Sequence, residues 1–395
     1  MKKFIYLCGI ILLQMNVIGQ VNVNDGWNLI LNEQFTGTGR GWEQNYSETR
    51  DTYIYTNPVQ TFRWCVDCVE LKEGVAGPNR HQAFQKANVI FNNSTYTDNK
   101  LRLMSEYISS TPLQCKGIRP TGYEIPVGTY HDCKPEEEKS IFYYSGNFQS
   151  NAQCFHFGYY EAECAMPVHD GAHAAFWLWG CYETETDSIY EEIDIAEYSN
   201  IDYDGDPYYG YSSGIWYNGE SSQHYTKENH QGYTHVHIPT TDPDIRQMHT
   251  YGCEWMPDHI IFYLDGKAIS EFRDRQSVPQ HEKYLKVSYS IDDYAVSRTM
   301  PSFPIWMGQD IMTVNQIKVY QLATDCNTDV LVQNATQLNQ IDSMKRSITI
   351  SNSSGVVLPS STNKTLRASD YIQINGPFEL DAVAELTLMV HECPN

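Results

Sequence analysis

Short apolar runs separated by turn-forming residues are the feature that most constrains how this chain can fold. Between Trp27 and Gln321 such runs are broken by clusters of Gly, Pro, Asn and Asp, and examples begin at His173 (HAAFWLWG) and at Asn315 (NQIKVYQ). Runs of this length and spacing are typical of strands in a sandwich or a barrel. The chain has no long stretch with the 3.6-residue period of a helix, no glycine-rich nucleotide-binding loop and no heptad repeat. The sequence therefore predicts an all-β fold.

One hairpin can be placed directly. Asp265-Gly266 is a two-residue signature of a type I′ turn, and hydrophobic residues flank it on both sides. We expect it to join a strand that ends at Leu264 to one that starts at Lys267.

The composition and the net charge indicate which classes of molecule this protein is expected to bind. The 395 residues are 41% hydrophobic and 13% aromatic, which is enough apolar surface to offset the ordering entropy of a globular fold. The 27 basic and 49 acidic residues give a formal net charge of −22 at pH 7, and no run rich in Lys or Arg occurs. Because this charge repels phosphate groups, we expect neither nucleic acid nor an anionic membrane surface as a partner. We expect the protein to act as a monomer.

The first nineteen residues are predicted to be a secretory signal peptide. Lys2 and Lys3 precede an apolar run from Phe4 to Leu13, and Val17 and Gly19 occupy the cleavage positions. This run is too short to cross a bilayer as a helix, and no later run is longer, so we expect no transmembrane segment. The mature protein is predicted to be secreted, periplasmic or located at the cell surface.

The cysteines agree with an oxidising compartment. Loss of Cys8 with the signal peptide leaves ten cysteines, an even number. Cys65 and Cys68 have the spacing of half a zinc site, but no second half follows, which favours a disulfide or free thiols there. The pairing of the ten cysteines is left open.

The composition changes after Leu322 and predicts the domain organisation. Residues 20–322 are expected to form the main β domain, the polar stretch 323–345 a linker, and residues 346–395 a small β-rich module. About fifty residues is near the lower limit for an independent core, so we expect this module to coil on itself or to lean on the main domain. Cys326 and Cys393 flank it and could tie it shut. We interpret the module as a spacer or attachment unit.

Three carboxylates within six residues form the candidate catalytic motif. Glu192, Asp194 and Glu197 stand at positions i, i+2 and i+5. On a regular strand the i+5 side chain would point away from the other two. A β-bulge around Ala196 would bring Glu197 back to the same face and leave the intervening isoleucines facing the core.

The neighbouring Glu191 would then point toward the core. A charge in that direction is costly unless it lies at the exposed start of the strand or is paired. We expect Glu191 at the exposed rim.

Crowded carboxyl groups suit one reaction in particular. Retaining glycoside hydrolysis needs a carboxylate nucleophile and a carboxylic acid about 5 to 5.5 Å apart. Repulsion and partial desolvation raise the pKa of one of them, so that a proton remains available near neutral pH. Acids on a strand can also bind calcium or simply face solvent, and these alternatives stay open.

Six segments in order along the chain resemble glycoside hydrolase family 16, whose members share a concanavalin-like β-sandwich jelly-roll. Besides the E-x-D-x-x-E motif at 192 (EIDIAE), the segments begin at 27 (WNLILNEQFTG), 157 (FGYYEAECAMP), 174 (AAFWLWG), 248 (MHTYGCEWMPDHIIFYLDGKAI) and 312 (MTVNQIKVYQ). The resemblance implies a retaining endo-glycosidase.

The resemblance also implies a role for each acid. Glu192 would be the nucleophile, Glu197 the general acid/base, and Asp194 the residue that positions and poises Glu192. The family needs no catalytic cofactor. The calcium that many members hold near the first and last strands is not expected here, because Gln34 and Asn315 stand in place of acids.

Three tryptophans are the candidate substrate-binding residues: Trp177, Trp179 and Trp216. Sugars present apolar C–H faces, so indole rings in a groove can bind a polysaccharide by stacking. Alternation places Trp177 and Trp179 on one face of their strand and Phe176 and Leu178 on the other.

A β-1,3- or mixed-linkage β-glucan is the first substrate prediction, because so acidic a chain suits a neutral polymer better than a sulfated one. The stretch before the acids, GCYETETDSIYEEIDIAE, lacks the W-P-x-x-G-E-I-D run of many β-1,3-glucanases. A galactan hydrolase of the agarase or porphyranase type is therefore the enzyme alternative. A carbohydrate-binding lectin or adhesin on the same sandwich is the non-catalytic one.

Overall fold

The structure of the chain is a computed structural model. It describes residues 3–5, 25–36, 42–47, 50–56, 63–66, 82–84, 89–90, 95–107, 113–114, 116–117, 132–133, 140–141, 143–150, 154–169, 171–181, 191–199, 210–217, 234–239, 244–273, 278–291, 308–360, 362–381 and 384–394.

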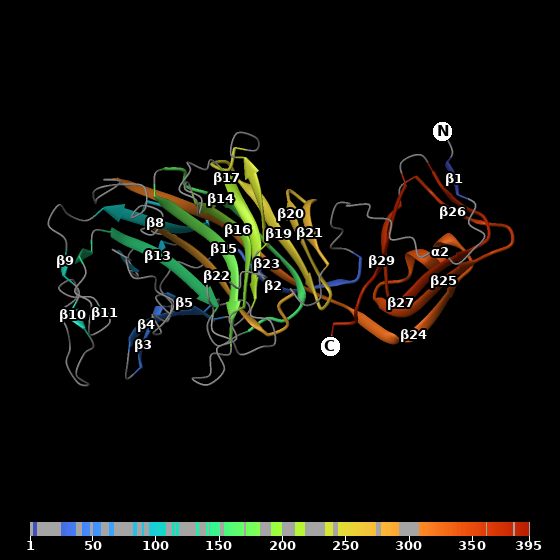
Figure 1. Cartoon of the computed structure of the whole chain (residues 1–395), viewed down its shortest axis with the longest axis horizontal. Helices are drawn as coiled ribbons and strands as arrows, with labels where there is room; N and C mark the ends of the chain where they lie inside the picture. Colours follow the sequence, from blue (N-terminus) through green and yellow to red (C-terminus); the bar gives the residue numbers. More distant parts are fainter. Residues whose placement is uncertain are drawn as a thin grey trace.

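The prediction of a β-sandwich is confirmed, with two mainly antiparallel sheets formed by the chain up to Leu322 (Figure 1). Hydrogen-bonded neighbours in the first sheet follow the order β3 (Trp42–Ser47), β4 (Arg50–Thr56), β5 (Arg63–Val66), β13 (Tyr143–Ser150), β22 (Lys283–Ile291), β15 (Ala172–Gly180), β16 (Glu191–Ser199), β17 (Gly210–Tyr217) and β18 (Thr234–Pro239).

The second sheet follows the order β21 (Lys267–Phe272), β20 (His259–Leu264), β19 (His249–Met256), β14 (Gly158–Ala165) and β23 (Gln309–Leu322). Two strands share the other edge of β23: β2 (Trp27–Glu33) along its second half and β8 (Leu101–Tyr107) along its first half. Strand β7 (Val89–Ile90) pairs with β8.

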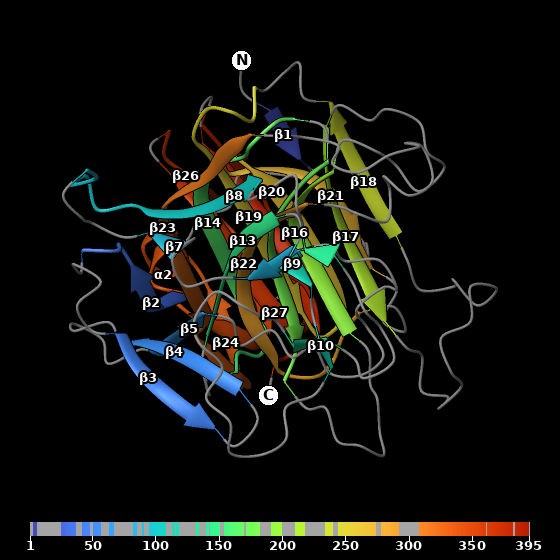
Figure 2. The same ribbon diagram turned by 90° about the vertical axis from the view of Figure 1, so that its left-hand side faces the viewer.

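Strand β13 connects the two layers. Its first residues pair with β8 and with β6 (Gln82–Phe84) in the second sheet, while Gly146 to Gln149 pair with β22 in the first. Two further short ladders are β9 (Leu113–Gln114) with β12 (Ser140–Ile141) and β10 (Lys116–Gly117) with β11 (Asp132–Cys133). Figure 2 views the molecule from the end at which β3 and β4 lie.

The core between the sheets follows from the alternation of apolar residues. Phe176 and Leu178 from β15 and Ile193 from β16 are fully buried in one cluster with Tyr160 and Trp255 from the second sheet. Burying side chains of this size contributes about 1.5–3 kcal/mol each. The polar face of β15 and β16 is therefore held outward.

The predicted hairpin is confirmed. Asp265 and Gly266 both have positive φ values, 50° and 75°, as a type I′ turn requires. Leu264 pairs with Lys267 across the turn, and the Asp265 carboxylate accepts a hydrogen bond from the Thr250 backbone N–H at 2.9 Å.

The C-terminal module is a coil of parallel strands, drawn orange to red in Figure 1. Its elements are β24 (Thr324–Val332), α2 (Ala335–Asn339), β25 (Met344–Ser351), β26 (Val356–Leu358), β27 (Asn363–Asn375), β28 (Phe378–Leu380) and β29 (Glu385–Val390). Strands β24, β25, β27 and β29 form one parallel sheet, and β26 and β28 pair in a second.

The stretch 323–345 is therefore not a linker, which corrects the prediction. It supplies β24, α2 and the start of β25, and its polar composition reflects an edge strand with exposed residues. Val332 and Leu338 are fully buried in the core of the module, so this stretch is part of its fold.

The module leans on the sandwich, as one of the two expectations had it. The Asp25 carboxylate accepts hydrogen bonds from the Lys364 Nζ and the Thr365 backbone N–H, both at 2.8 Å. The Arg367 guanidinium lies 5.2 Å from the centre of the Trp27 ring. Met344 of the module lies in one buried cluster with side chains of the sandwich.

Two disulfides lie among the described residues. Cys326–Cys393 closes the module, as its flanking position suggested, and Cys154–Cys181 joins the segments before β14 and after β15. Cys164 and Cys253 are buried free thiols, so not every cysteine of the predicted even set is paired. The Cys65 and Cys68 side chains lie outside the described residues.

Within the predicted signal peptide, β1 (Lys3–Ile5) pairs antiparallel with β28. None of the helices in the described part of the chain is long and apolar enough to cross a membrane.

We predict that Cys326→Ser destabilises the C-terminal module. The disulfide closes a loop across a sequence separation of 67 residues, and a bridge of this size contributes about 2–5 kcal/mol. Thermal unfolding should show the module melting earlier in the variant, while Cys164→Ala, which removes an unpaired thiol, should not separate the two transitions. Unfolding of the module at an unchanged temperature in Cys326→Ser would contradict the expectation.

Candidate active site

A β-bulge in β16 brings the three carboxylates to one face. In the ladder with β17, Asp194 pairs with Gly214 and Glu197 pairs with Ser212, so Ser213 alone stands opposite both Ile195 and Ala196. The Ser213 Oγ donates a hydrogen bond of 2.7 Å to the Ile195 carbonyl oxygen, which fixes the irregular backbone. The bulge lies where the spacing of the acids predicted it.

The bulge produces the predicted separation of acids from aliphatic side chains. Carboxylate oxygens of Glu192, Asp194 and Glu197 lie within 4.8 Å of one another. Ile193 and Ile195 are buried beneath them in the core. The three acids thus share a single small volume at the surface of the first sheet.

Crowding and burial change the protonation of this group. Burial, together with the nearby Glu197 charge, raises the pKa of Glu192 to about 7, although a hydrogen bond with Asp194 and the charges of Lys286 and His173 oppose the rise. Two interacting carboxyl groups titrate as a unit. One proton therefore stays with the pair at pH values where ordinary carboxyl groups are ionised.

Trp177 and Trp179 flank the acids on the neighbouring strand. Trp179 pairs with Glu192 and Trp177 with Asp194, and both indoles are half-buried with ring centres 5.5 Å apart. The Trp177 Nε1–H donates to the Ser288 Oγ at 3.1 Å. Both side chains lie on the face of β15 opposite the buried Phe176 and Leu178, as predicted.

Trp216 stands opposite Glu192 in the ladder between β16 and β17. Its side chain lies outside the described residues, so its predicted contact with substrate stays a prediction.

Lys286 is a site residue that the sequence analysis missed. It is buried on β22 opposite Trp177, and its ammonium lies 4.2 Å from the Trp177 ring centre and 5.6 Å from that of Trp179. The cation favours the ionised form of Glu192. Nothing in the local sequence of β22 marks this lysine, because its place depends on the pairing of β22 with β15.

His173 is the second residue that was missed. Its Nε2 lies 3.4 Å from a Glu197 carboxylate oxygen, and the Ser290 Oγ lies 3.4 Å from its Nδ1. Both His173 and Trp177 belong to β15 and are four residues apart, so strand alternation would have placed them on one face.

Glu191 corrects the expectation of an exposed rim position. It is 6% exposed, and its carboxylate accepts a 2.7 Å hydrogen bond from the fully buried Lys283 ammonium. The backbone N–H groups of Gln280 and His281 also donate to it. Burial acts to raise the pKa of Glu191, but Lys283 and the other donors hold it below its usual value. Glu191 is thus buried and paired, which was the other condition under which its charge was expected to be tolerated.

Of the two positions considered for calcium, Asn315 contacts another side chain and Gln34 is exposed. The Asn315 Nδ2 donates to the Glu163 carboxylate at 2.5 Å, and Gln34 is exposed beside β2. Oxygen donors of Glu192, Asp194 and Glu197 are also spaced closely enough to hold a cation. The Lys286 ammonium near these acids already compensates part of their negative charge, which makes a second cation there less favourable.

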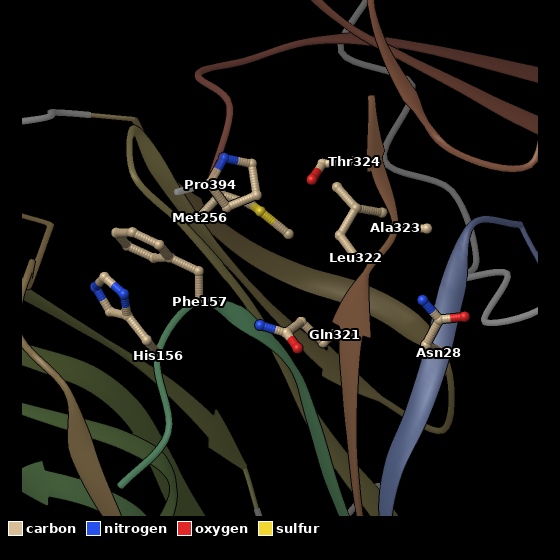
Figure 3. Close-up of a pocket in the computed structure, with 9 residues that line it drawn as sticks. All are labelled: Asn28, His156, Phe157, Met256, Gln321, Leu322, Ala323, Thr324 and Pro394. Carbon is tan, nitrogen blue, oxygen red and sulfur yellow. The ribbon is translucent and has the colours of Figure 1, made fainter. Parts of the chain in front are cut away.

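A separate cavity of about 470 Å³ lies where the sandwich meets the C-terminal module (Figure 3). Its lining contains no residue of β15, β16 or β22, and so none of the three acids. It is formed by Asn28, His156, Phe157, Met256, Gln321, Leu322, Ala323, Thr324 and Pro394.

The model of the glycosyl hydrolases family 16 matches residues 84–302, which is more than half of the chain and includes all three acids. The chain belongs to this family. The resemblance inferred from the six sequence segments is confirmed.

Individual relatives match shorter regions. The chain is 29% identical to a kappa-carrageenase of Pseudoalteromonas carrageenovora over 140 residues, covering 33% of this chain and 34% of the relative. It is 30% identical to a beta-glucanase of Acetivibrio thermocellus over 138 residues, covering 35% and 34%. The matched region thus spans about a third of the length of these curated relatives.

Comparison with solved structures supports the fold. A non-specific endo-beta-1,3(4)-glucanase from family GH16 superposes with a TM-score of 0.50 at 16% identity, covering 77% of this chain and 94% of that one. This family 16 chain therefore has the jelly-roll sandwich that was predicted.

We predict that Glu192→Gln makes stability less dependent on pH. Because folding raises the pKa of Glu192 to about 7, its contribution to stability is complete below the unfolded pKa and is lost as the pH rises through about 7. Glutamine cannot ionise, so the variant should gain on the order of 1–3 kcal/mol relative to wild type between pH 5 and pH 8. Denaturant titrations at both pH values measure this gain.

The matched control is Glu385→Gln, which removes an exposed carboxylate from the C-terminal module. Its difference from wild type should be the same at both pH values. A Glu192→Gln difference that is equally independent of pH would show that burial does not raise this pKa.

Proposed function

We propose that this family 16 chain is an exported endo-acting glycoside hydrolase that cleaves a polysaccharide with retention of anomeric configuration. One observation carries the proposal: the bulge in β16 gathers Glu192, Asp194 and Glu197 on a single face beside two half-buried indoles. Oxygens within 4.8 Å of one another fit the close carboxyl pair of retaining enzymes better than the 6.5–9.5 Å pair of inverting ones.

The proposed reaction is a double displacement. Glu192 attacks the anomeric carbon while Glu197 donates a proton to the leaving glycosidic oxygen, and a covalent glycosyl-enzyme forms. Glu197 then takes a proton from water, which attacks the same carbon and releases Glu192.

The reactive state has Glu192 ionised and the shared proton on Glu197. The hydrogen bond with Asp194 and the Lys286 charge both favour ionised Glu192, because both act to lower its pKa. These two groups therefore oppose the effect of burial on Glu192 and favour transfer of the shared proton to Glu197.

For the substrate we propose a β-1,3- or mixed-linkage β-glucan. The beta-glucanase relative and the strongly acidic composition support a neutral polymer. The kappa-carrageenase relative and the Lys286 cation near the acids support a galactan as the alternative. Residues 1–19, which have the organisation of a signal peptide, support the export part of the proposal.

The test measures new reducing ends with laminarin, lichenan, agarose, porphyran and carrageenan. The wild-type protein should act on one class of polymer, and Glu192→Gln and Glu197→Gln should each lower kcat by at least about 10³-fold, because each removes a group that reacts. Proton NMR of the first products should show the anomer of the substrate linkage. Polymer binding without new reducing ends, unchanged in both variants, would mark a lectin instead.

We predict that Lys286→Met shifts the acidic limb of the pH profile of kcat/KM to higher pH. Loss of the cation raises the pKa of Glu192, so a higher pH is needed to ionise the nucleophile. Lys318→Met is the control, since Lys318 pairs with Glu161 on the second sheet at 3.1 Å. An acid limb that stays in place in Lys286→Met would exclude this role for Lys286.

A further inference from the structure

Three buried groups meet where the C-terminal module joins the sandwich. Glu254 lies on β19, His259 begins β20, and His391 follows β29 of the module. Their side chains are at most 2% exposed. The centres of the two imidazole rings are 5.2 Å apart.

Each histidine has its Nδ1 engaged by an oxygen. The His259 Nδ1 lies 2.9 Å from the Asp258 Oδ1, and the His391 Nδ1 lies 3.0 Å from the Glu392 carbonyl oxygen. The second Asp258 oxygen accepts the Glu392 backbone N–H at 3.0 Å. Histidines that bind metals are oriented in this way, with one ring nitrogen held by an oxygen and the other left for the ion.

The Glu254 carboxylate is oriented in the same manner. Its Oε2 accepts a hydrogen bond from the Tyr263 hydroxyl at 3.3 Å and lies 3.6 Å from the Arg367 Nη2. Its Oε1 lies 3.5 Å from the His259 Nε2. This separation exceeds that of a charge-assisted hydrogen bond, about 2.7–2.9 Å.

Three atoms that could bind a metal ion therefore have no hydrogen-bond partner among the described residues. They are Glu254 Oε1, His259 Nε2 and His391 Nε2. Buried polar atoms of this kind are rare and call for a bound ion or water. Donors of two ligands on one tetrahedral zinc ion lie about 3.3 Å apart, given bonds of 2.0–2.1 Å. The 3.5 Å between Glu254 and His259 is close to that value.

The local charge also favours a cation. The Arg367 guanidinium lies 3.6 Å from the Glu254 carboxylate, and the second carboxylate, Asp258, contacts His259. With neutral imidazoles, Glu254 and Asp258 carry two negative charges against the one positive charge of Arg367, and Glu254 is fully buried, where uncompensated charge is costly.

We propose that a divalent transition metal, with zinc as the best match, binds between the two modules through Glu254 Oε1, His259 Nε2 and His391 Nε2. Imidazole nitrogen together with a carboxylate is a donor set that zinc favours. The Glu254 Oε1 lies 3.5 Å from the His259 Nε2, and His259 and His391 also belong, with Asp258, to a group whose ligand atoms lie within 4.8 Å of one another. Binding therefore requires the Glu254 and His391 side chains to turn toward one ion beside His259. Because His391 comes from the C-terminal module, the ion would fasten that module to the second sheet.

The test uses the full chain, stripped with EDTA and then titrated with ZnCl2, CaCl2 or MgCl2. We expect one zinc ion per chain with a micromolar or tighter Kd by calorimetry, a rise in Tm of several degrees, and no comparable effect of calcium or magnesium. His391→Gln should weaken zinc binding by at least about tenfold, because it removes one of three ligands. His156→Gln, which alters a histidine outside the cluster, should bind zinc like the wild type.

CoCl2 provides a readout that does not depend on a folded variant. The wild-type protein should give the visible absorption of four-coordinate cobalt without a sulfur-to-cobalt charge-transfer band, which separates this site from Cys65 and Cys68. Absence of zinc binding, zinc binding unchanged in His391→Gln, or a sulfur band would each overturn the proposal. A protonated His259 shared between Asp258 and Glu254 would then account for the cluster. None of these readouts depends on hydrolysis, so their failure is distinct from failure of the proposed function.

Discussion

The candidate active site depends on one local irregularity, in which a single residue of β17 pairs with two residues of β16. Core packing holds Ile193 and Ile195 inward, and the extra residue then turns Glu197 back toward Glu192. Without it the carboxylates would divide between the two faces, and one of them would be forced into an apolar interior. The hydrophobic effect thus supplies the free energy that keeps mutually repelling acids together, and the Ser213 hydrogen bond keeps the irregular backbone in one conformation.

Charges around the acids are arranged in two different ways. Glu191 and Lys283 form a buried pair that anchors the start of β16, and such a pair suits a fixed structure. Glu192 and Glu197 instead share a space with nearby cations that do not fully neutralise them, so their protonation can change during a reaction. Glu191 therefore has a structural role and Glu192, the next residue, a reactive one. Strand alternation places their side chains on opposite faces of the sheet.

Features that depend on local pattern could be predicted from the sequence, and features that depend on distant pairing could not. Alternation and turn chemistry located the strands, the hairpin at Asp265 and the bulge. Lys283 lies 92 residues from Glu191, so the partner that makes burial of Glu191 tolerable was not visible. Lys286 was missed for the same reason. The stretch 323–345 resembled a linker because an edge strand of a small parallel coil buries few side chains, and composition alone does not distinguish the two.

The order in which the chain is made has a consequence for β2. In the described pairings this strand bonds only to β23, which lies near the end of the sandwich sequence, and Asp25 beside it binds the C-terminal module. Strand β2 must therefore wait, unpaired, until β23 has been synthesised. Contacts between such remote segments form slowly, which lengthens the time for which β2 presents an unpaired strand edge during folding.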